Sequence, residues 1–325
     1  MSTNILIDRA SGIPLVGSIA FGILDRGSSL IQVRPSTACN MKCTFCSTSA
    51  NDFSLHPVNY VVEPDYLLEW TKEIAAFKGK LHVNIDSAGE PSAYPHLEYF
   101  IENVKKLPEV YFISMQSNGT LLTEKKIKAL EKAGLNRINL SLHTLDAAKG
   151  KRLFGSEHYN LDNALKAIEI LKKTSVEVLL APVWLPNVND NDIVELIKFA
   201  KEEGLGIAIQ KYEVYKHSRR DPEAKKVNFY RFYKQLKEWE REFDMRLVYH
   251  ADDLQVQPAP RLPEVMHARE KVQAVVKAPG WMPNQMICSA KNRSITVINC
   301  CAKIGDKLNI RILESNNNIY LAEVD

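Results

Sequence analysis

The sequence has few cysteines and lacks long apolar runs, low-complexity tracts, long-period repeats and a strong charge of either sign. Its 325 residues include 6 cysteines, and the net charge is +3. Because small secreted scaffolds depend on many disulfides, this cysteine content argues against that class of protein. A charge so close to balance says little about partners, so only its distribution along the chain is informative.

The first 27 residues lack the basic segment and the long apolar segment of a signal peptide. Their most apolar run, "IPLVGSIAFGIL", has twelve residues and is interrupted by Gly17 and Gly22. It is too short to cross a membrane, and we interpret it as paired strands. We therefore expect a cytoplasmic protein with reduced thiols and no membrane partner.

Short β-rich runs alternate with longer helical patterns from residue 30 to about residue 250. The expected strands are 30–35, 80–89, 110–119, 137–144, 176–186 and 205–215, and the expected helices are 63–77, 96–107, 123–134, 160–174, 190–204 and 229–243. This alternation is typical of parallel strands joined by right-handed crossovers. Six such units predict an α/β fold, an open, partial (β/α)6 barrel of the TIM type, whose site lies at the carboxyl ends of the strands.

The length predicts one large domain and one small domain. We place an N-terminal hairpin extension at 1–29, the partial barrel at 30–250, a connecting arm at 251–272 and a small all-β domain at 273–325. Prolines interrupt the alternation after residue 250, and the short β-rich runs beyond it are joined by the turn signals "IGD" and "NNN".

Three cysteines, Cys39, Cys43 and Cys46, follow the first strand of the series with the spacing C-x3-C-x2-C. Structural zinc sites and four-iron clusters normally take four protein ligands. Three thiolates on one loop leave one iron of a four-iron cluster without a protein ligand and open to an outside molecule. The alternative is a zinc site that is completed by a histidine or by one of the three C-terminal cysteines.

The spacing resembles the signature of the radical S-adenosylmethionine (radical SAM) enzymes, and Phe45 is the aromatic residue that the family favours before the last cysteine. The resemblance covers roughly residues 30–215. It implies a [4Fe-4S] cluster on Cys39, Cys43 and Cys46. It also implies S-adenosyl-L-methionine as cofactor, bound through its amino and carboxylate groups and cleaved by the reduced cluster to a 5′-deoxyadenosyl radical.

The stretch "DSAGEP" resembles the GGEP element of the same family, with Ala88 in place of its first glycine. The resemblance implies that Gly89 and Glu90 hold the methionyl amino group, since a carboxylate suits an ammonium. On its own, a "GEP" sequence is usually a turn.

Three later stretches resemble the third-strand, fourth-strand and fifth-strand elements of the family, namely "SMQSNGT", "NLSLHT" and "APVWLPNVNDNDI". The resemblance implies cofactor contacts at Gln116, Asn118, Ser141 and His143, a carboxylate contact at Arg152, and an adenine wall at Val183 and Leu185. The plainer alternatives are a solvated serine, a histidine that supports its strand and a solvated arginine at a helix end.

The C-terminal run "IGDKLNIRILE" resembles a TRAM module, the small β-barrel of several RNA-modifying enzymes. Residues 261–311 contain nine Lys/Arg and three Asp/Glu, and "KHSRR" at 216–220 is a second basic run. A basic β-barrel can follow phosphates, and Trp281 or Tyr320 can stack bases. The alternative is an accessory domain whose charges are only solvated.

The remaining cysteines, Cys288, Cys300 and Cys301, allow two interpretations. They can hold a second cluster, or they can be free and buried, which adjacent cysteines on opposite faces of a strand favour.

The leading hypothesis is a radical SAM enzyme that takes electrons from an external donor and modifies RNA, with tRNA as the expected substrate and the C-terminal domain as the recruiting part. The N-terminal hairpin also resembles that of uncharacterised archaeal radical SAM proteins. The alternatives are modification of a peptide or small metabolite, with or without an auxiliary cluster, and an RNA-binding protein with a structural metal.

Overall fold

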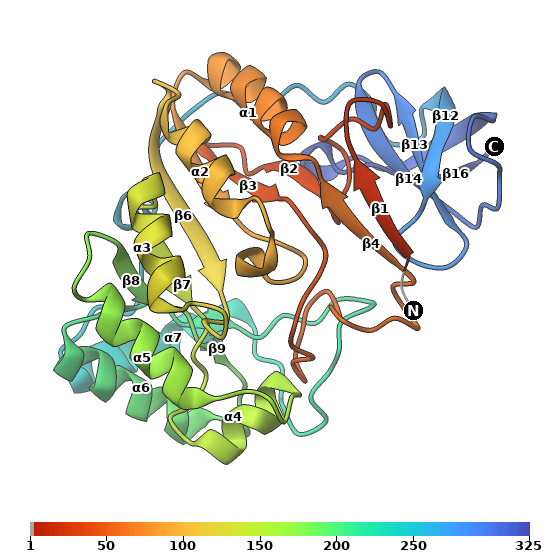
Figure 1. The fold of residues 1–325 in the computed structure, drawn as a ribbon. Coiled ribbons are helices and arrows are strands. Elements are labelled where there is room, and N and C mark those ends of the chain that lie inside the picture. Colours follow the sequence, from red (N-terminus) through yellow and green to blue (C-terminus); the bar gives the residue numbers. More distant parts are fainter. Residues whose placement is uncertain (1–2) are drawn as a thin grey trace. The chain divides into compact units, whose positions relative to one another are not determined.

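A computed structural model describes residues 3–325 (Figure 1). The chain forms two compact units. The first unit consists of Met1–Cys39, Asn51–Ile113 and Val256–Asp325, and the second of Asn40–Ala50 and Ser114–Gln255. The cysteine motif therefore crosses from one unit to the other within a few residues.

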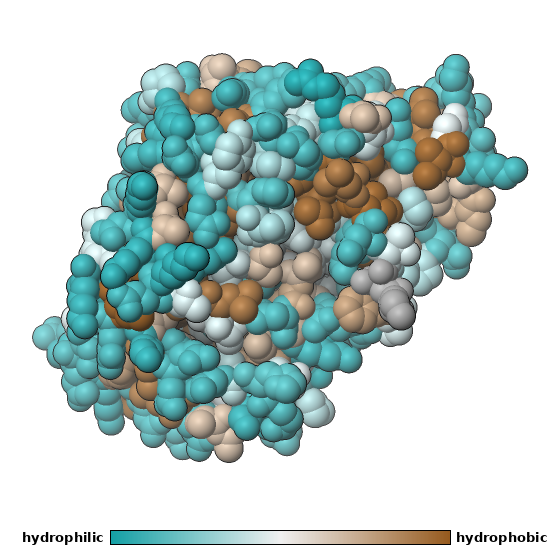
Figure 2. Space-filling view, viewed as in Figure 1, coloured by the Kyte–Doolittle hydropathy of each residue, from teal (hydrophilic) through white to brown (hydrophobic). Residues whose placement is uncertain are grey.

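The helices are those that the amphipathic pattern predicts, with one addition. They are α1 (Pro64–Lys78), α2 (Leu97–Lys105), α3 (Glu124–Ala133), α4 (Ala147–Phe154), α5 (Leu161–Leu171), α6 (Asp190–Glu203) and α7 (Phe229–Phe243). The added helix is α4. Their outward surfaces are mostly hydrophilic in the view of Figure 2.

Local capping explains why the helices begin and end where they do. The Glu63 side chain accepts hydrogen bonds from the backbone N–H groups of Asp65 and Tyr66, and Pro64 occupies the first helical position. Asn228 caps α7 in the same way through the N–H of Arg231.

The strands are β1 (Thr3–Ile7), β2 (Gly22–Asp25), β3 (Leu30–Arg34), β4 (Val58–Val62), β5 (Leu81–Ile85), β6 (Val110–Ser117), β7 (Arg137–Leu140), β8 (Glu177–Leu180), β9 (Val183–Trp184), β10 (Gly206–Ile207), β11 (Gln210–Lys211), β12 (Lys271–Pro279), β13 (Gln285–Ala290), β14 (Arg293–Ile298), β15 (Lys307–Glu314) and β16 (Leu321–Val324). Each predicted strand of the barrel contains at least one of them. The expected fifth and sixth strands are each broken into two short strands.

In the second unit, β6, β7, β8 and β10 pair in parallel in that order, and β9 pairs with β11. Because successive side chains of a strand point to opposite faces of the sheet, the two faces carry different residue types. Met115, Ile138 and Val178 point to one face, whereas Gln116 and Asn139, paired in register, point to the other. Gln116 and Asn139 therefore lie side by side on one face of the sheet.

In the first unit, β3 pairs in parallel with β5 and antiparallel with β2, which forms a hairpin with it. The interpretation of residues 13–24 as paired strands is wrong in detail, because only Gly22–Leu24 of that run is strand and β2 pairs with β3. The first strand, β1, instead pairs in parallel with β4.

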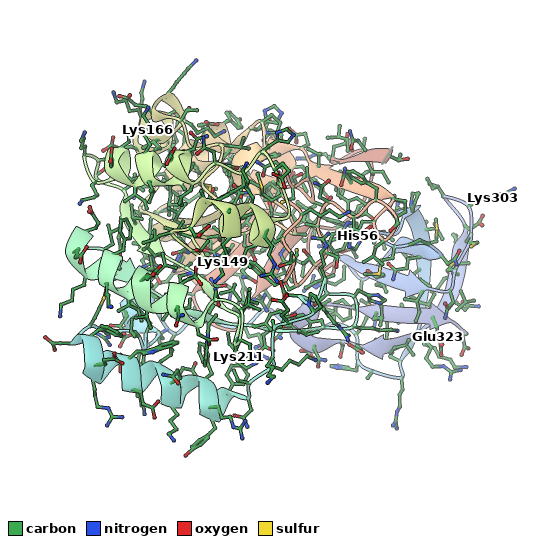
Figure 3. All side chains as sticks on the ribbon, turned by 90° about the horizontal axis from the view of Figure 1, so that it is seen from below. His56, Lys149, Lys166, Lys211, Lys303 and Glu323 are labelled. Carbon is green, nitrogen blue, oxygen red and sulfur yellow. The ribbon has the colours of Figure 1, made fainter. Side chains whose placement is uncertain are left out.

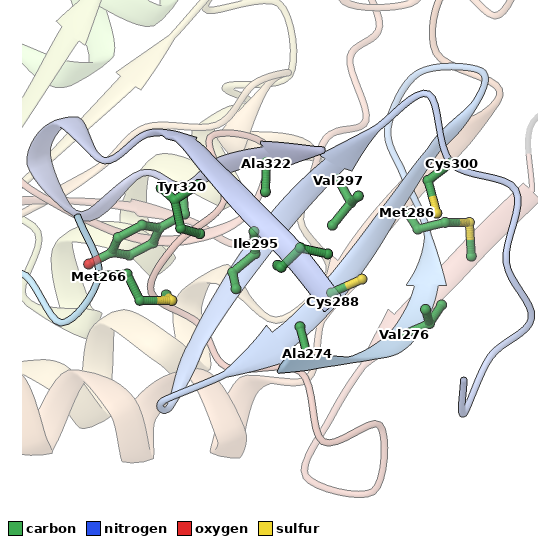
Figure 4. Close-up of a cluster of buried hydrophobic side chains, with 12 residues drawn as sticks. Met266, Ala274, Val276, Met286, Cys288, Ile295, Val297, Cys300, Tyr320 and Ala322 are labelled. Atoms are coloured by element: carbon green, nitrogen blue, oxygen red, sulfur yellow. The ribbon is translucent and has the colours of Figure 1, made fainter. Parts of the chain in front are cut away.

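The C-terminal part is a closed barrel with the strand order β12-β13-β14-β16-β15. Its interior is an apolar cluster that includes Val276, Cys288, Ile295, Val297 and Ile310 (Figure 4). Strand β12 begins at Lys271, so the last two residues of the expected connecting arm, 251–272, belong to the barrel. No helix among residues 3–325 has the length and apolar character that crossing a bilayer requires.

Candidate functional site

The three motif cysteines, Cys39, Cys43 and Cys46, have intermediate exposure. In the second unit, the loop that carries Cys43 and Cys46 is attached to the end of α4. The backbone N–H groups of Lys42 and Thr44 donate to the carbonyls of Phe154 and Leu153, each at 2.9 Å. A helix that the periodicity did not predict therefore supports this loop.

Gly155, the C-cap of α4, permits this close approach. Its φ of +59° lies in the left-handed region, and a Cβ added there would lie 2.1 Å from the Lys42 carbonyl oxygen. Any other residue at this position would be strained and would also push the cysteine loop away.

The sulfur of Cys46 contacts one backbone N–H donor and one hydroxyl group. The Ala50 N–H donates to its Sγ at 3.3 Å, and the Thr48 hydroxyl oxygen lies 3.4 Å away. Hydrogen bonds to cysteine sulfurs are one of the features that tune iron–sulfur clusters.

Phe45 and His143, both predicted to contact the cofactor, contact each other. Their rings meet edge to face with centroids 4.8 Å apart, and Phe45 packs in an apolar cluster with Leu153 and Leu185. The Val183 N–H donates to Nδ1 of His143 at 3.1 Å, so the proton of the neutral ring sits on Nε2. Burial lowers the pKa of His143 to about 3, which keeps the ring uncharged at neutral pH.

The GEP element lies against the residue that precedes the first cysteine. The Glu90 N–H donates to the Ala38 carbonyl at 2.8 Å, and a Cβ on Gly89 would lie 1.9 Å from that same oxygen. The conformation therefore requires glycine at 89, and the alanine at 88 is compatible with it. The buried Glu90 carboxylate accepts from the Ser92 N–H at 3.0 Å.

Gln116 and Asn139 point to the polar face of the sheet from neighbouring strands. Among residues 3–325, neither Oε1 of Gln116 nor Oδ1 of Asn139 has a hydrogen-bond partner, although both atoms are buried. Buried acceptors of this kind normally find a donor. The methionyl ammonium and the ribose hydroxyls of S-adenosylmethionine are donors of the required kind.

Asn118 serves the loop structure. Its Nδ2 donates to Oδ1 of Asn40 at 2.9 Å, and its own Oδ1 accepts from the N–H and hydroxyl of Thr120. Ser141 is half-buried after β7, and its N–H donates to the Ser117 carbonyl at 2.8 Å.

Arg152 faces acidic side chains of its own unit. Its guanidinium lies 3.0 Å from the Glu223 carboxylate and 3.5 Å from that of Asp221. The buried Asp221 also accepts from the Thr44 hydroxyl at 2.9 Å. In this arrangement Arg152 links α4 to the segment after β11, a role that the carboxylate-contact prediction did not include.

Sequence reasoning missed the role of Arg219, which it counted only as part of the second basic run, "KHSRR", in support of RNA binding. Its guanidinium donates to the carbonyl oxygens of Cys43, Ser49 and Ala50. Contacts to backbone carbonyls leave no residue-type pattern in the partner, so only the fold reveals them.

The two aromatic residues expected to stack bases are buried. Trp281 stacks on His56 with ring centroids 3.9 Å apart (His56 is labelled in Figure 3), and Tyr320 lies inside the barrel. The interpretation of either ring as a base-stacking platform is therefore wrong.

Cys288 and Cys300 are free and buried in the barrel core, and Cys301 is exposed. Burial raises the pKa of the Cys288 thiol to about 12, so it is neutral. For Cys288 and Cys300, the burial agrees with the prediction of free buried cysteines. Among residues 3–325, no three His, Cys, Asp or Glu side chains are grouped so as to hold one metal ion, and this finding includes Cys39, Cys43 and Cys46.

Comparisons with known proteins identify the class. The family described as the Radical SAM superfamily matches residues 33–200. The chain is 34% identical over 346 residues to "Uncharacterized protein MJ0103" of Methanocaldococcus jannaschii, covering 96% of this chain and 79% of that protein. It is 29% identical over 189 residues to GTP 3',8-cyclase of Aquifex aeolicus, covering 58% of each protein.

A solved structure of the FeFe-hydrogenase maturase HydG from Carboxydothermus hydrogenoformans shares the fold, with a TM-score of 0.55 at 13% identity over 70% of this chain and 55% of that one. The chain belongs to the radical SAM superfamily. It is a radical SAM enzyme, and its cofactors are a [4Fe-4S] cluster and S-adenosylmethionine. The TRAM resemblance of the C-terminal barrel stays a prediction.

The residues present suit both groups. The sequence motif supplies three cysteines, the Ala50 N–H donates to the Cys46 sulfur, and the polar sheet face carries the buried acceptors of Gln116 and Asn139. In the described residues, 3–325, the three cysteine side chains are not grouped as they would be around one metal ion. The residue assignments themselves stay predictions.

Proposed function

We propose that the protein uses a 5′-deoxyadenosyl radical to modify RNA, with tRNA as the substrate class. In this proposal Cys39, Cys43 and Cys46 hold the cluster, and Glu90, Gln116 and neighbouring polar groups orient the nucleotide. When bound and reduced by an external donor, the cluster supplies the electron that splits the sulfonium into methionine and the radical.

One surface carries the RNA part of the proposal. We call it the aromatic–basic surface, and it spans residues 215–237 of the second unit, which include eight Lys/Arg and two Asp/Glu. Its exposed rings are Tyr215 (61% exposed), Phe229 (58%), Tyr230 (77%) and Tyr233 (44%). Its exposed cations are Lys216, Arg220, Lys225, Lys226, Arg231, Lys234 and Lys237.

Helix α7 organises this surface. Its inward residues Phe232, Leu236 and Trp239 are buried, which leaves the rings and cations of the opposite side in solvent. Phe229 and Tyr233 stack with centroids 6.3 Å apart, and the Lys211 ammonium (labelled in Figure 3) lies 4.6 Å from the Phe229 ring centre. Exposed rings interleaved with cations suit unpaired bases and their phosphates.

The C-terminal barrel is a weaker candidate for binding RNA than its number of Lys and Arg residues indicated, because several of these cations are paired or buried. Lys271 and Arg311 both pair with Asp325, Lys291 pairs with Glu270, and Arg293 is buried. The aromatic–basic surface is therefore the better candidate for phosphate contacts.

A small nucleotide is the second candidate substrate. The similarity to GTP 3',8-cyclase favours it, although this chain spans about 58% of that relative. A nucleotide needs the polar sheet face but not the aromatic–basic surface.

Binding of a fluorescent tRNA at several salt concentrations separates these candidates. The variant K225Q/K226Q/K234Q removes three exposed cations, so the slope of log K against log salt should fall by about 2. The control K303Q/K307Q removes two exposed lysines of the C-terminal barrel. The slope of log K against log salt should change less in this variant than in the triple variant. An equal slope in parent and triple variant, with GTP binding retained, rejects the RNA substrate in favour of the nucleotide.

The product requires a separate measurement. We expect mass spectrometry of total nucleosides to show one modified nucleoside that is absent from cells without the gene. Identical nucleoside profiles would contradict the proposal.

A further inference from the structure

Arg219 makes several hydrogen bonds to the loop that carries Cys43 and Cys46, and the proposed function gives these hydrogen bonds no role. Its guanidinium donates to the carbonyls of Cys43 at 2.8 Å, Ala50 at 2.9 Å and Ser49 at 3.3 Å, and its backbone N–H donates to the Cys46 carbonyl at 2.9 Å. One residue thus contacts the carbonyl oxygens of two motif cysteines and of the turn that follows them.

The residues beside Arg219 hold the same loop. The Ser218 hydroxyl donates to the Ser47 carbonyl at 3.0 Å, and the Ser49 hydroxyl donates to the His217 carbonyl at 2.6 Å. Residues 217–219 therefore hold the loop from Cys43 to Ala50 in one conformation.

The loop has little structure of its own to keep this conformation. The Cys46 and Ser49 N–H groups make turn bonds of 3.3 and 3.2 Å, and no residue from Asn40 to Ala50 is in a helix or strand. A planar guanidinium offers several donors at fixed angles, which an ammonium cannot match.

We propose that Arg219 is the positioning residue of the cluster loop. It fixes the backbone carbonyls of the cysteines, and its permanent positive charge beside Cys43 makes a bound cluster easier to reduce. The charge argument is Coulombic: an added electron is stabilised by a nearby cation, and cluster potentials respond to local charge. This inference does not depend on the identity of the substrate.

The test uses the full chain with two variants. Arg219→Gln removes the charge and the fork, and Arg219→Lys keeps the charge but loses the fork. In apo protein, we expect the Cys46, Ser49 and Ala50 amides to exchange about tenfold faster with deuterium in both variants. In reconstituted protein, the midpoint potential of the cluster should move to a more negative value in Arg219→Gln, and by less in Arg219→Lys.

Arg220→Gln is the matched control, because the exposed Arg220 side chain adjoins Arg219 in sequence and the change removes the same charge. Its loop exchange and cluster potential should equal those of the parent. Deuterium exchange of the backbone amides elsewhere in the second unit shows whether each variant is folded. Loop exchange within twofold of the parent in both Arg219 variants, or an unchanged potential in Arg219→Gln, overturns the proposal.

Discussion

At the residue scale, the sequence motifs name candidate side chains for the chemistry but not the residues that hold them in place. Cys39, Cys43 and Cys46 stand in a fixed spacing, and Glu90 follows a recognisable glycine. Arg219 and Asp221 have no such pattern, because their partners are carbonyls and a hydroxyl from distant segments. A residue that acts through backbone atoms is recognised only after folding.

His143 gives a prediction at this scale. Its pKa falls from 6.5 to about 3 in the folded protein because of burial, so below pH 6.5 the unfolded chain takes up a proton that the folded chain refuses. Stability from this group is therefore complete above pH 6.5 and declines as the pH falls toward 3. Between pH 7.5 and 5.5, the parent should lose about 1.4 kcal/mol more unfolding free energy than His143→Gln.

Urea unfolding of apo protein at both pH values measures this difference. His250→Gln, a change at an exposed histidine, should track the parent. Equal pH dependence in parent and His143→Gln would show that His143 is protonated in the folded state.

At the scale of elements, helices with a long amphipathic pattern were predicted correctly, whereas elements with a short or interrupted pattern were missed. Helix α7 occupies the same residues, 229–243, as its sequence pattern. Helix α4 was missed because it has eight residues and contains Gly150. Strand β12 was missed because prolines nearby outweighed the alternation of its buried Ala274, Val276 and Ala278.

The end of α4 gives a prediction at this scale. Gly155→Ala adds left-handed strain of about 1–2 kcal/mol and also a clash with the Lys42 carbonyl. We therefore expect a larger loss of unfolding free energy than strain alone explains, together with weaker iron retention after reconstitution.

The matched control is Gly204→Ala. Gly204 has a φ of +69° but nothing within 4 Å of an added Cβ, so it suffers the strain without the clash. If urea unfolding gives the same loss of unfolding free energy for Gly155→Ala and Gly204→Ala, the close approach at Gly155 does not contribute to stability.

At the scale of the whole chain, a buried ion pair links distant segments of the first unit. The Lys78 ammonium lies 2.8 Å from the Asp25 carboxylate, and both side chains are almost fully buried. Lys78 also donates to the carbonyls of Ser28 and Pro260. The pair thus connects β2, the end of α1 and the segment that leads to the C-terminal barrel.

Lys78→Met should cost about 3–5 kcal/mol of unfolding free energy, because it leaves a buried carboxylate without its cation. Lys106→Met, in an exposed pair with Glu102, should cost less than about 1 kcal/mol. Chemical denaturation compares the two. A small loss for Lys78→Met would mean that water reaches Asp25 in the folded protein.

The interleaved first unit has a consequence for synthesis. The Ser294 N–H donates to the Val16 carbonyl and the Tyr320 N–H to that of Gly17, so the beginning of the chain is held by its end. Residues 8–21 leave the ribosome long before these partners exist. The first unit therefore reaches its native form only after residues 294–320 have been synthesised.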